Sequence, residues 1–132
     1  MSDGTVSVVP MTVQRLLRAL TEVIDSHNWE ALPGLLHAEF SCHYVHTGES
    51  FDAQAWVRLN AQYPGFQHFI LEDCVADGDR AVGRFHVTAL GQDGMQHFEV
   101  ASFITVSDEL IASMTEVWTG VDEAAPAGTR PG

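Results

Sequence analysis

The second half of the chain contains four segments typical of β-strands, joined by turns of only a few residues. The segments cover residues 67–76, 80–90, 95–106 and 110–121, and the turns between them have the sequences DGD, GQDG and SDE. Tight turns connect antiparallel strands, whereas parallel strands need a long crossover. The sequence therefore predicts a four-stranded antiparallel meander, and the rest of the chain must cover one face of it.

The first half is predicted to begin with two helices. Residues 12–26 place apolar side chains at helical spacing, and Thr12 is a candidate N-cap. Residues 28–40 predict a second, shorter helix. Pro33 and Gly34 lie in its middle, so we expect this helix to be irregular or broken.

A short strand over residues 41–50 should follow, and Asp52 is positioned to cap a third helix. The Pro64-Gly65 pair would end that helix. We therefore expect an α+β fold in which three N-terminal helices pack on a curved antiparallel sheet. A cavity between the two layers is a common place for a ligand.

The length of 132 residues fits a single domain. We expect that domain to cover residues 11–122, between a flexible N-terminal tail (1–10) and a flexible Pro/Gly-rich C-terminal tail (123–132). Cys42 and Cys74 form no CxxC motif, and no signal sequence or membrane-length apolar run is visible. These features favour a reduced, cytoplasmic protein.

Charge excludes several function classes. The formal net charge is −12, the chain has no lysine, and no basic cluster is visible. The charge argues against nucleic acids and anionic membrane surfaces as partners. The absence of lysine excludes a Schiff-base mechanism and a phosphate-loop lysine. Any cation in a site must be an arginine or a protonated histidine.

Arg84 and His86 lie two residues apart in a predicted strand and therefore on the same face. Alternation alone leaves two possibilities open. Either the pair lies on the solvent face of a strand whose Phe85 and Val87 form the core, or the pair faces a ligand cavity. In the first case the segment would be an interface feature, and an enzyme hypothesis built on the pair would fail.

The order of elements resembles the NTF2-like superfamily, in particular its SnoaL-like and small actinobacterial members. The resemblance covers residues 11–122 and is carried by NWEALPGLLHAEF before the short strand and by IASMTEVWTG as the last strand. It implies a cone-shaped pocket and frequent homodimers. The fold hosts isomerases, cyclases, dehydratases, epoxide hydrolases and binding modules, so it does not determine the chemistry.

The site pattern is similar to that of limonene-epoxide-hydrolase-like members. These carry Tyr-x-Asn after the second helix, Arg-x-Asp on a central strand and Asp on the last strand. The corresponding positions here are Tyr44 with His46, Arg84 with His86, and Glu116. Three substitutions separate the two patterns, so the resemblance implies the position of the site and not the substrate.

Ketosteroid isomerase activity is not favoured by the same comparison. The base of those enzymes corresponds best to His46. Their two oxyanion donors, a Tyr and an Asp, correspond to Thr21 and Ala101, which cannot replace them. SnoaL-like cyclases use an acid/base group in the same cavity and imply an aromatic lining.

If these residues face inward, Arg84 needs a carboxylate partner, and Glu116 on a neighbouring strand is the nearest one. His86 and His46 would then transfer protons, while Arg84 or Tyr44 would stabilise oxyanion charge. The candidate site residues are His46, Arg84, His86 and Glu116 for catalysis, and Tyr44, Trp56, Phe103 and Trp118 for substrate contact.

We therefore expect a cofactor-independent acid/base enzyme that acts on a small, largely apolar organic molecule, and a homodimer formed through the sheet. No metal is expected, because His43 and His46 would point to opposite faces of a strand. The alternative is a non-catalytic module that binds a small molecule or a protein. An enzyme should leave His46, His86 or Glu116 open to the cavity without a full set of internal partners, whereas a binding module should close them into a network.

Overall fold

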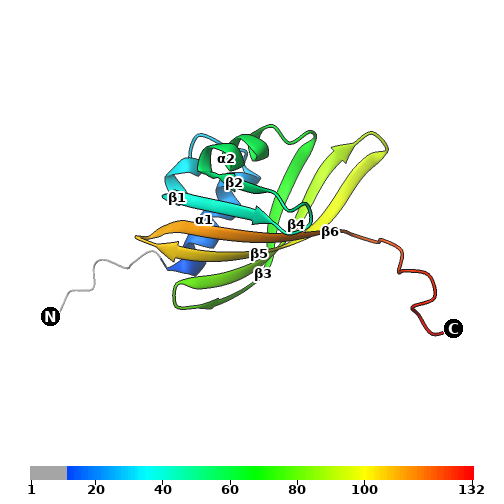
Figure 1. Cartoon of the computed structure of the whole chain (residues 1–132). Helices are drawn as coiled ribbons and strands as arrows, with labels where there is room; N and C mark the ends of the chain where they lie inside the picture. Colours follow the sequence, from blue (N-terminus) through cyan, green and yellow to red (C-terminus); the bar gives the residue numbers. More distant parts are fainter. Residues whose placement is uncertain (1–11) are drawn as a thin grey trace.

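The computed structural model describes residues 12–132, and Figure 1 shows the arrangement of its elements. The expected tail over residues 1–10 lies outside this range. The elements in chain order are α1 (Val13–Asp25), the 3₁₀ turn η1 (Leu32–Leu35), β1 (Leu36–Tyr44), β2 (Ser50–Asp52), α2 (Ala53–Ala61), β3 (Phe66–Asp77), β4 (Arg80–Gly91), β5 (Gly94–Ser107) and β6 (Leu110–Gly120). No helix in the described range is long and apolar enough to cross a membrane.

The six strands form one curved sheet in the order β2-β1-β6-β5-β4-β3. Strands β3 to β6 pair as consecutive antiparallel neighbours, which confirms the predicted meander. One pair departs from this pattern, because β1 lies parallel to β6. The two strands are far apart in the chain, so no tight turn forces them to be antiparallel.

Helix α1 forms where the apolar periodicity predicts it. The Thr12 hydroxyl accepts a hydrogen bond from the Arg15 amide at 3.2 Å and caps the helix. The buried stripe of α1 includes Leu16, Leu17 and Leu20. The helix packs against β3 and β4 and so covers one face of the meander.

The prediction of a second helix is wrong, because this segment forms only a single helical turn. Only η1 (Leu32–Leu35) is helical, and the chain enters β1 at Leu36. Pro33 and Gly34 lie in this turn, and neither residue favours a longer helix. Residues 12–132 therefore form two α-helices instead of the expected three, while the α+β class is as predicted.

Helix α2 is capped as predicted, since the Asp52 carboxylate accepts a hydrogen bond from the Ala55 amide at 2.8 Å. The helix packs against β1 and β2. Its Trp56 side chain is fully buried in the core. Helices α1 and α2 thus cover different parts of the same sheet face, which we call the inner face; the opposite surface is the outer face.

Side-chain alternation on β4 separates the two faces. Phe85 and Val87 are buried against the helices. Arg84 is exposed and His86 partly exposed on the outer face. The same alternation on β5 and β6 decides which polar residues reach the inner face.

Gly65 fixes the connection between α2 and β3. Its φ is +72°, its carbonyl accepts a 2.7 Å hydrogen bond from the Leu90 amide, and a Cβ atom would collide with the Leu90 carbonyl. Gly48 has a similar φ of +77° but open space around it. Substitutions at these two glycines therefore distinguish the cost of backbone strain from the cost of a steric clash.

We expect Gly48→Ala to lower the free energy of unfolding by about 1 kcal/mol through the left-handed backbone alone. Gly65→Ala should cost about 1–3 kcal/mol more, because the Leu90 backbone must move. Urea unfolding of both variants measures the difference. Equal losses would show that the β3–β4 region absorbs the clash.

Candidate active site

A cavity of about 480 Å³ opens between the helices and the inner sheet face. Its aromatic lining comes from helix α2, the strands and their connections. These residues are Tyr44, Trp56, Tyr63, Phe66, Phe69, Phe98 and Trp118. The polar side chains that line it are His46, Thr47, Glu49, Asn60, Glu116, Thr119 and Glu123.

Glu116 on β6 is the buried acid of this cavity, with 3% of its surface exposed. Strand register brings two partners beside it, because Glu116 lies opposite Tyr44 of β1 and Ser102 of β5. Ser102 Oγ donates to Oε2 at 3.2 Å, and Trp118 Nε1 donates to Oε1 at 2.9 Å. Tyr44 lies beside the same carboxyl group and contributes to lowering its pKa. Two donors and a neighbouring phenol therefore surround one carboxyl group.

The orientation of Tyr44 follows from a second tryptophan. Trp56 Nε1 of α2 donates to Tyr44 Oη at 3.2 Å. An indole N–H can only donate, so the phenol oxygen accepts there and keeps its own proton for another partner. Trp56 of α2 thus holds the Tyr44 hydroxyl beside the buried acid.

Burial raises the pKa of Glu116 to about 7, although hydrogen bonds from Trp118, Ser102 and Tyr44 pull it in the opposite direction. A carboxyl group with this pKa is present in both protonation states at neutral pH and can therefore give or accept a proton. Burial, and then the neighbouring Glu116, raise the pKa of Tyr44. Tyr44 consequently remains protonated and acts as a donor.

His46 lies just after β1, where the cavity meets solvent. Its ring stacks on Tyr44 at 5.3 Å between centroids and lies 6.0 Å from the Trp118 ring. Within residues 12–132 its ring nitrogens have no hydrogen-bond partner. A second group able to exchange protons therefore lies next to the aromatic pair that contacts Glu116.

Arg84 and His86 are on the outer face, so their predicted place in the cavity is wrong. Arg84 Nη1 donates to Glu72 at 3.0 Å and to Glu99 at 2.8 Å, and the predicted Arg84–Glu116 pair does not form. His86 Nδ1 lies 2.6 Å from Glu99 Oε2. The cause is strand parity, because Phe85 takes the inner position on β4.

The prediction that Phe103 lines the cavity is also wrong, because this residue lies on the outer face with 48% of its surface exposed. Its neighbours Ser102 and Ile104 are buried and take the inner positions on β5. Of the predicted site residues, the structure brings together His46, Glu116, Tyr44, Trp56 and Trp118.

Ser102, Asn60, Glu49 and Glu123 also line or support the cavity and were not among the predicted residues. Ser102 had a usable signal, because it shares the parity of the apolar residues Val100 and Ile104 on β5. The other three lie on α2 or in connecting segments, where strand alternation gives no information.

The outer face holds a group with spacing suitable for a metal ion. Glu72, His86 and Glu99 place ligand atoms within 4.8 Å of one another, and no other such group occurs in residues 12–132. Arg84 already donates to both carboxylates. A cation there would have to displace the guanidinium group, and this cluster lies on the opposite face of the sheet from the cavity.

The pKa of Glu116 predicts how stability depends on pH. The folded state holds the Glu116 proton more tightly than the unfolded chain, so the contribution of Glu116 to stability is fully present below pH 4.5 and is lost as pH rises through about 7. This loss amounts to a few kcal/mol, on the order of 3. Glu116→Gln cannot ionise, so its stability relative to the wild type should improve by that amount between pH 4.5 and pH 8.

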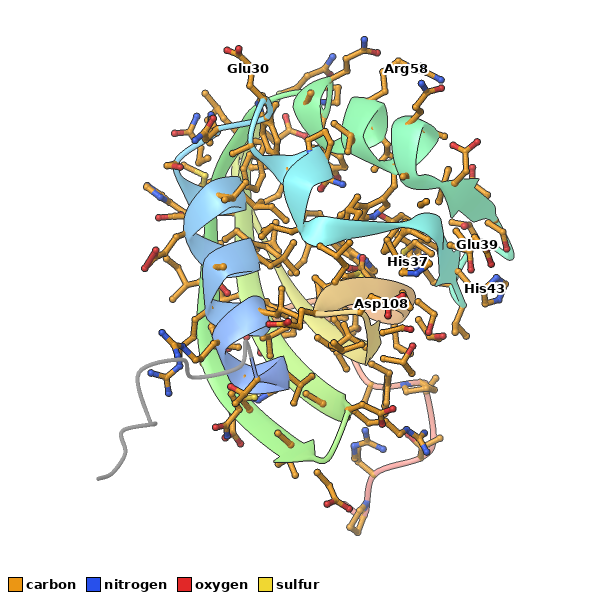
Figure 2. All side chains as sticks on the ribbon, turned by 90° about the vertical axis from the view of Figure 1, so that its left-hand side faces the viewer. Glu30, His37, Glu39, His43, Arg58 and Asp108 are labelled. Atoms are coloured by element: carbon orange, nitrogen blue, oxygen red, sulfur yellow. The ribbon has the colours of Figure 1, made fainter. Side chains whose placement is uncertain are left out.

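Urea unfolding of both proteins across this range measures the effect. Glu39→Gln, which removes an exposed carboxylate on β1 (Figure 2), is the control for losing any one charge. A difference between wild type and Glu116→Gln that does not vary with pH would contradict the prediction.

Comparisons with known proteins agree with this architecture. Residues 17–114 match the SnoaL-like domain family. No curated protein sequence matches the chain. A candidate ketosteroid isomerase from Kribbella flavida superposes with a TM-score of 0.75 at 24% identity, covering 86% of this chain and 82% of its own.

Two further solved structures share the fold. IdmH, a candidate polyketide cyclase from Streptomyces antibioticus, has a TM-score of 0.70 at 16% identity and covers 80% of this chain and 91% of its own. An LEH-like epoxide hydrolase from M. tuberculosis has a TM-score of 0.69 at 14% identity, with coverages of 81% and 82%. These likenesses concern the NTF2-like fold. From the match over most of its length, the chain belongs to the SnoaL-like domain family.

Proposed function

We propose that this protein is a cofactor-independent enzyme that uses Glu116 to move a proton on a small, largely apolar organic molecule. The observation that carries the proposal is a buried carboxyl group with a pKa of about 7, held by two donors at an aromatic cavity. The reaction would be of the isomerase, cyclase, dehydratase or hydrolase type. Relatives with this fold include proteins named for three such activities.

In this proposal ionised Glu116 takes a proton from a carbon next to a carbonyl group, or from water or a substrate hydroxyl. The donors Ser102 and Trp118 hold the carboxylate in place while it acts. His46 at the cavity opening supplies the second proton-transfer group. Arg84 and His86 have no role in this reaction, because both lie on the outer face.

The alternative is a binding module, and one observation favours it. Glu116 accepts hydrogen bonds from Ser102 and Trp118 within the protein, as a purely structural network would provide. His46 favours the enzyme, since its ring is next to the cavity without a hydrogen-bond partner in the described chain. The two functions therefore differ in whether Glu116 can react with a bound molecule.

5-Nitrobenzisoxazole tests this directly, because it is a neutral aromatic compound whose ring opens when a base removes its C–H proton. The proton passes to the Glu116 carboxylate, the N–O bond breaks, and its electron pair leaves on the phenolate oxygen. We expect the rate to rise with pH and level off above about pH 7, as Glu116 ionises. Glu116→Gln should lose about a hundredfold or more.

His86→Ala is the matched control for His46→Ala, because it removes an imidazole from the outer face and should keep the wild-type rate. His46→Ala should lower the rate if this ring contributes to proton exchange. An unchanged rate in Glu116→Gln, or a bound but unreacted compound, would overturn the enzyme proposal and favour the binding module.

We also propose that the outer sheet face joins two copies of the chain. Phe103 and Val117 are exposed there to 48% and 42%, beside the apolar neighbours Val82 and Ala101 on adjacent strands. An exposed apolar patch on a sheet commonly marks a contact surface.

Light scattering coupled to gel filtration tests the assembly. We expect a dimer for the wild type and a monomer for Phe103→Glu, because the introduced charges would face each other across a two-fold interface. Gln54→Glu introduces the same charge at an exposed position of α2, which covers the inner face, and should remain dimeric. A monomeric wild type would show that the dimer proposal is wrong.

A further inference from the structure

The charges around the cavity are of one sign. Three carboxyl groups line it, those of Glu49, Glu116 and Glu123. The other ionisable lining residues are His46 and two tyrosines. No arginine in residues 12–132 contributes to the lining, and the chain contains no lysine. The formal net charge of −12 adds to this negative field.

The two carboxylates at the cavity opening, Glu49 and Glu123, form no ion pair with neighbouring side chains in the described chain. Glu49 and Glu123 are both exposed, so they lie where the cavity opens to solvent. None of the ion pairs in the described chain includes either of them. Arg58 on α2 projects away from the body of the protein (Figure 2), and Arg84 is held on the outer face.

The aromatic side chains that line the cavity also favour a cationic ligand. The ring faces of tryptophan and tyrosine carry negative potential and attract cations. Tyr44 and Trp118 both line the cavity. Asn60 donates from Nδ2 to the Trp56 carbonyl at 2.8 Å, and its amide oxygen remains an acceptor.

We propose that the cavity selects an apolar ligand that carries a protonated amine, with the amine held at the opening by Glu49 and Glu123, and that it excludes carboxylates and phosphates. This inference rests on the proposed function, because it assumes that the cavity is where the substrate binds. It adds the charge class of the substrate, which neither the fold nor Glu116 determines.

Three probes with one skeleton separate charge from shape: 2-naphthylmethylamine, 2-naphthalenemethanol and 2-naphthoic acid, which are cationic, neutral and anionic at pH 7. Calorimetric titration of the full chain with each gives the affinities. We expect the amine to bind about tenfold more tightly than the alcohol, and the acid to bind least. Raising the salt concentration should reduce the amine's advantage.

The double variant Glu49→Gln/Glu123→Gln should remove most of that advantage. Asp77→Asn/Asp79→Asn is the matched control, because it removes the same charge at the β3–β4 turn. Phe66 lines the cavity at the first residue of β3, and Asp77 is the last residue of that strand. The control should keep the wild-type preference.

Equal affinity for amine and alcohol, or an unchanged preference in Glu49→Gln/Glu123→Gln, would overturn this inference. If 5-nitrobenzisoxazole still reacts through Glu116, the proposed function then stands without it. Failure of all three probes to bind would also overturn the inference, and together with a lack of proton abstraction it would overturn the proposed function as well.

Discussion

The carboxyl group of Glu116 lies in an aromatic cavity, and the rest of the site depends on keeping it there. Burying an ionisable group without partners costs several kcal/mol, so each of its oxygens needs donors. The donors are Ser102 on β5 and Trp118 on β6, and Tyr44 on β1 lies beside the acid. The parallel pairing of β1 with β6 therefore places Tyr44 at the site and is also a feature of the sheet.

Helix α2 reaches the surroundings of Glu116 through Trp56, which is buried and donates to the Tyr44 hydroxyl. A shift of α2 would therefore move Tyr44 relative to Glu116, although no side chain of α2 hydrogen-bonds the acid itself. Helix packing and acid/base chemistry are coupled at this point of the fold.

The sheet separates two sets of polar groups that have different physical consequences. On the outer face Arg84 pairs with Glu72 and Glu99, and solvent screens these exposed ion pairs. On the inner face burial raises the pKa of Glu116 towards neutrality. Similar residue types thus form a solvent-screened network on one side and a group suited to proton transfer on the other.

The sequence by itself determined the meander, helix α1 with its Thr12 cap, helix α2 with its Asp52 cap, and Glu116, His46 and the two tryptophans as cavity residues. These follow from local periodicity, turn chemistry and the resemblance to a family. Only the tertiary structure decided that Arg84, His86 and Phe103 face outward and that Ser102 faces Glu116. Alternation shows which residues share a face, but which face is buried depends on where the helices pack.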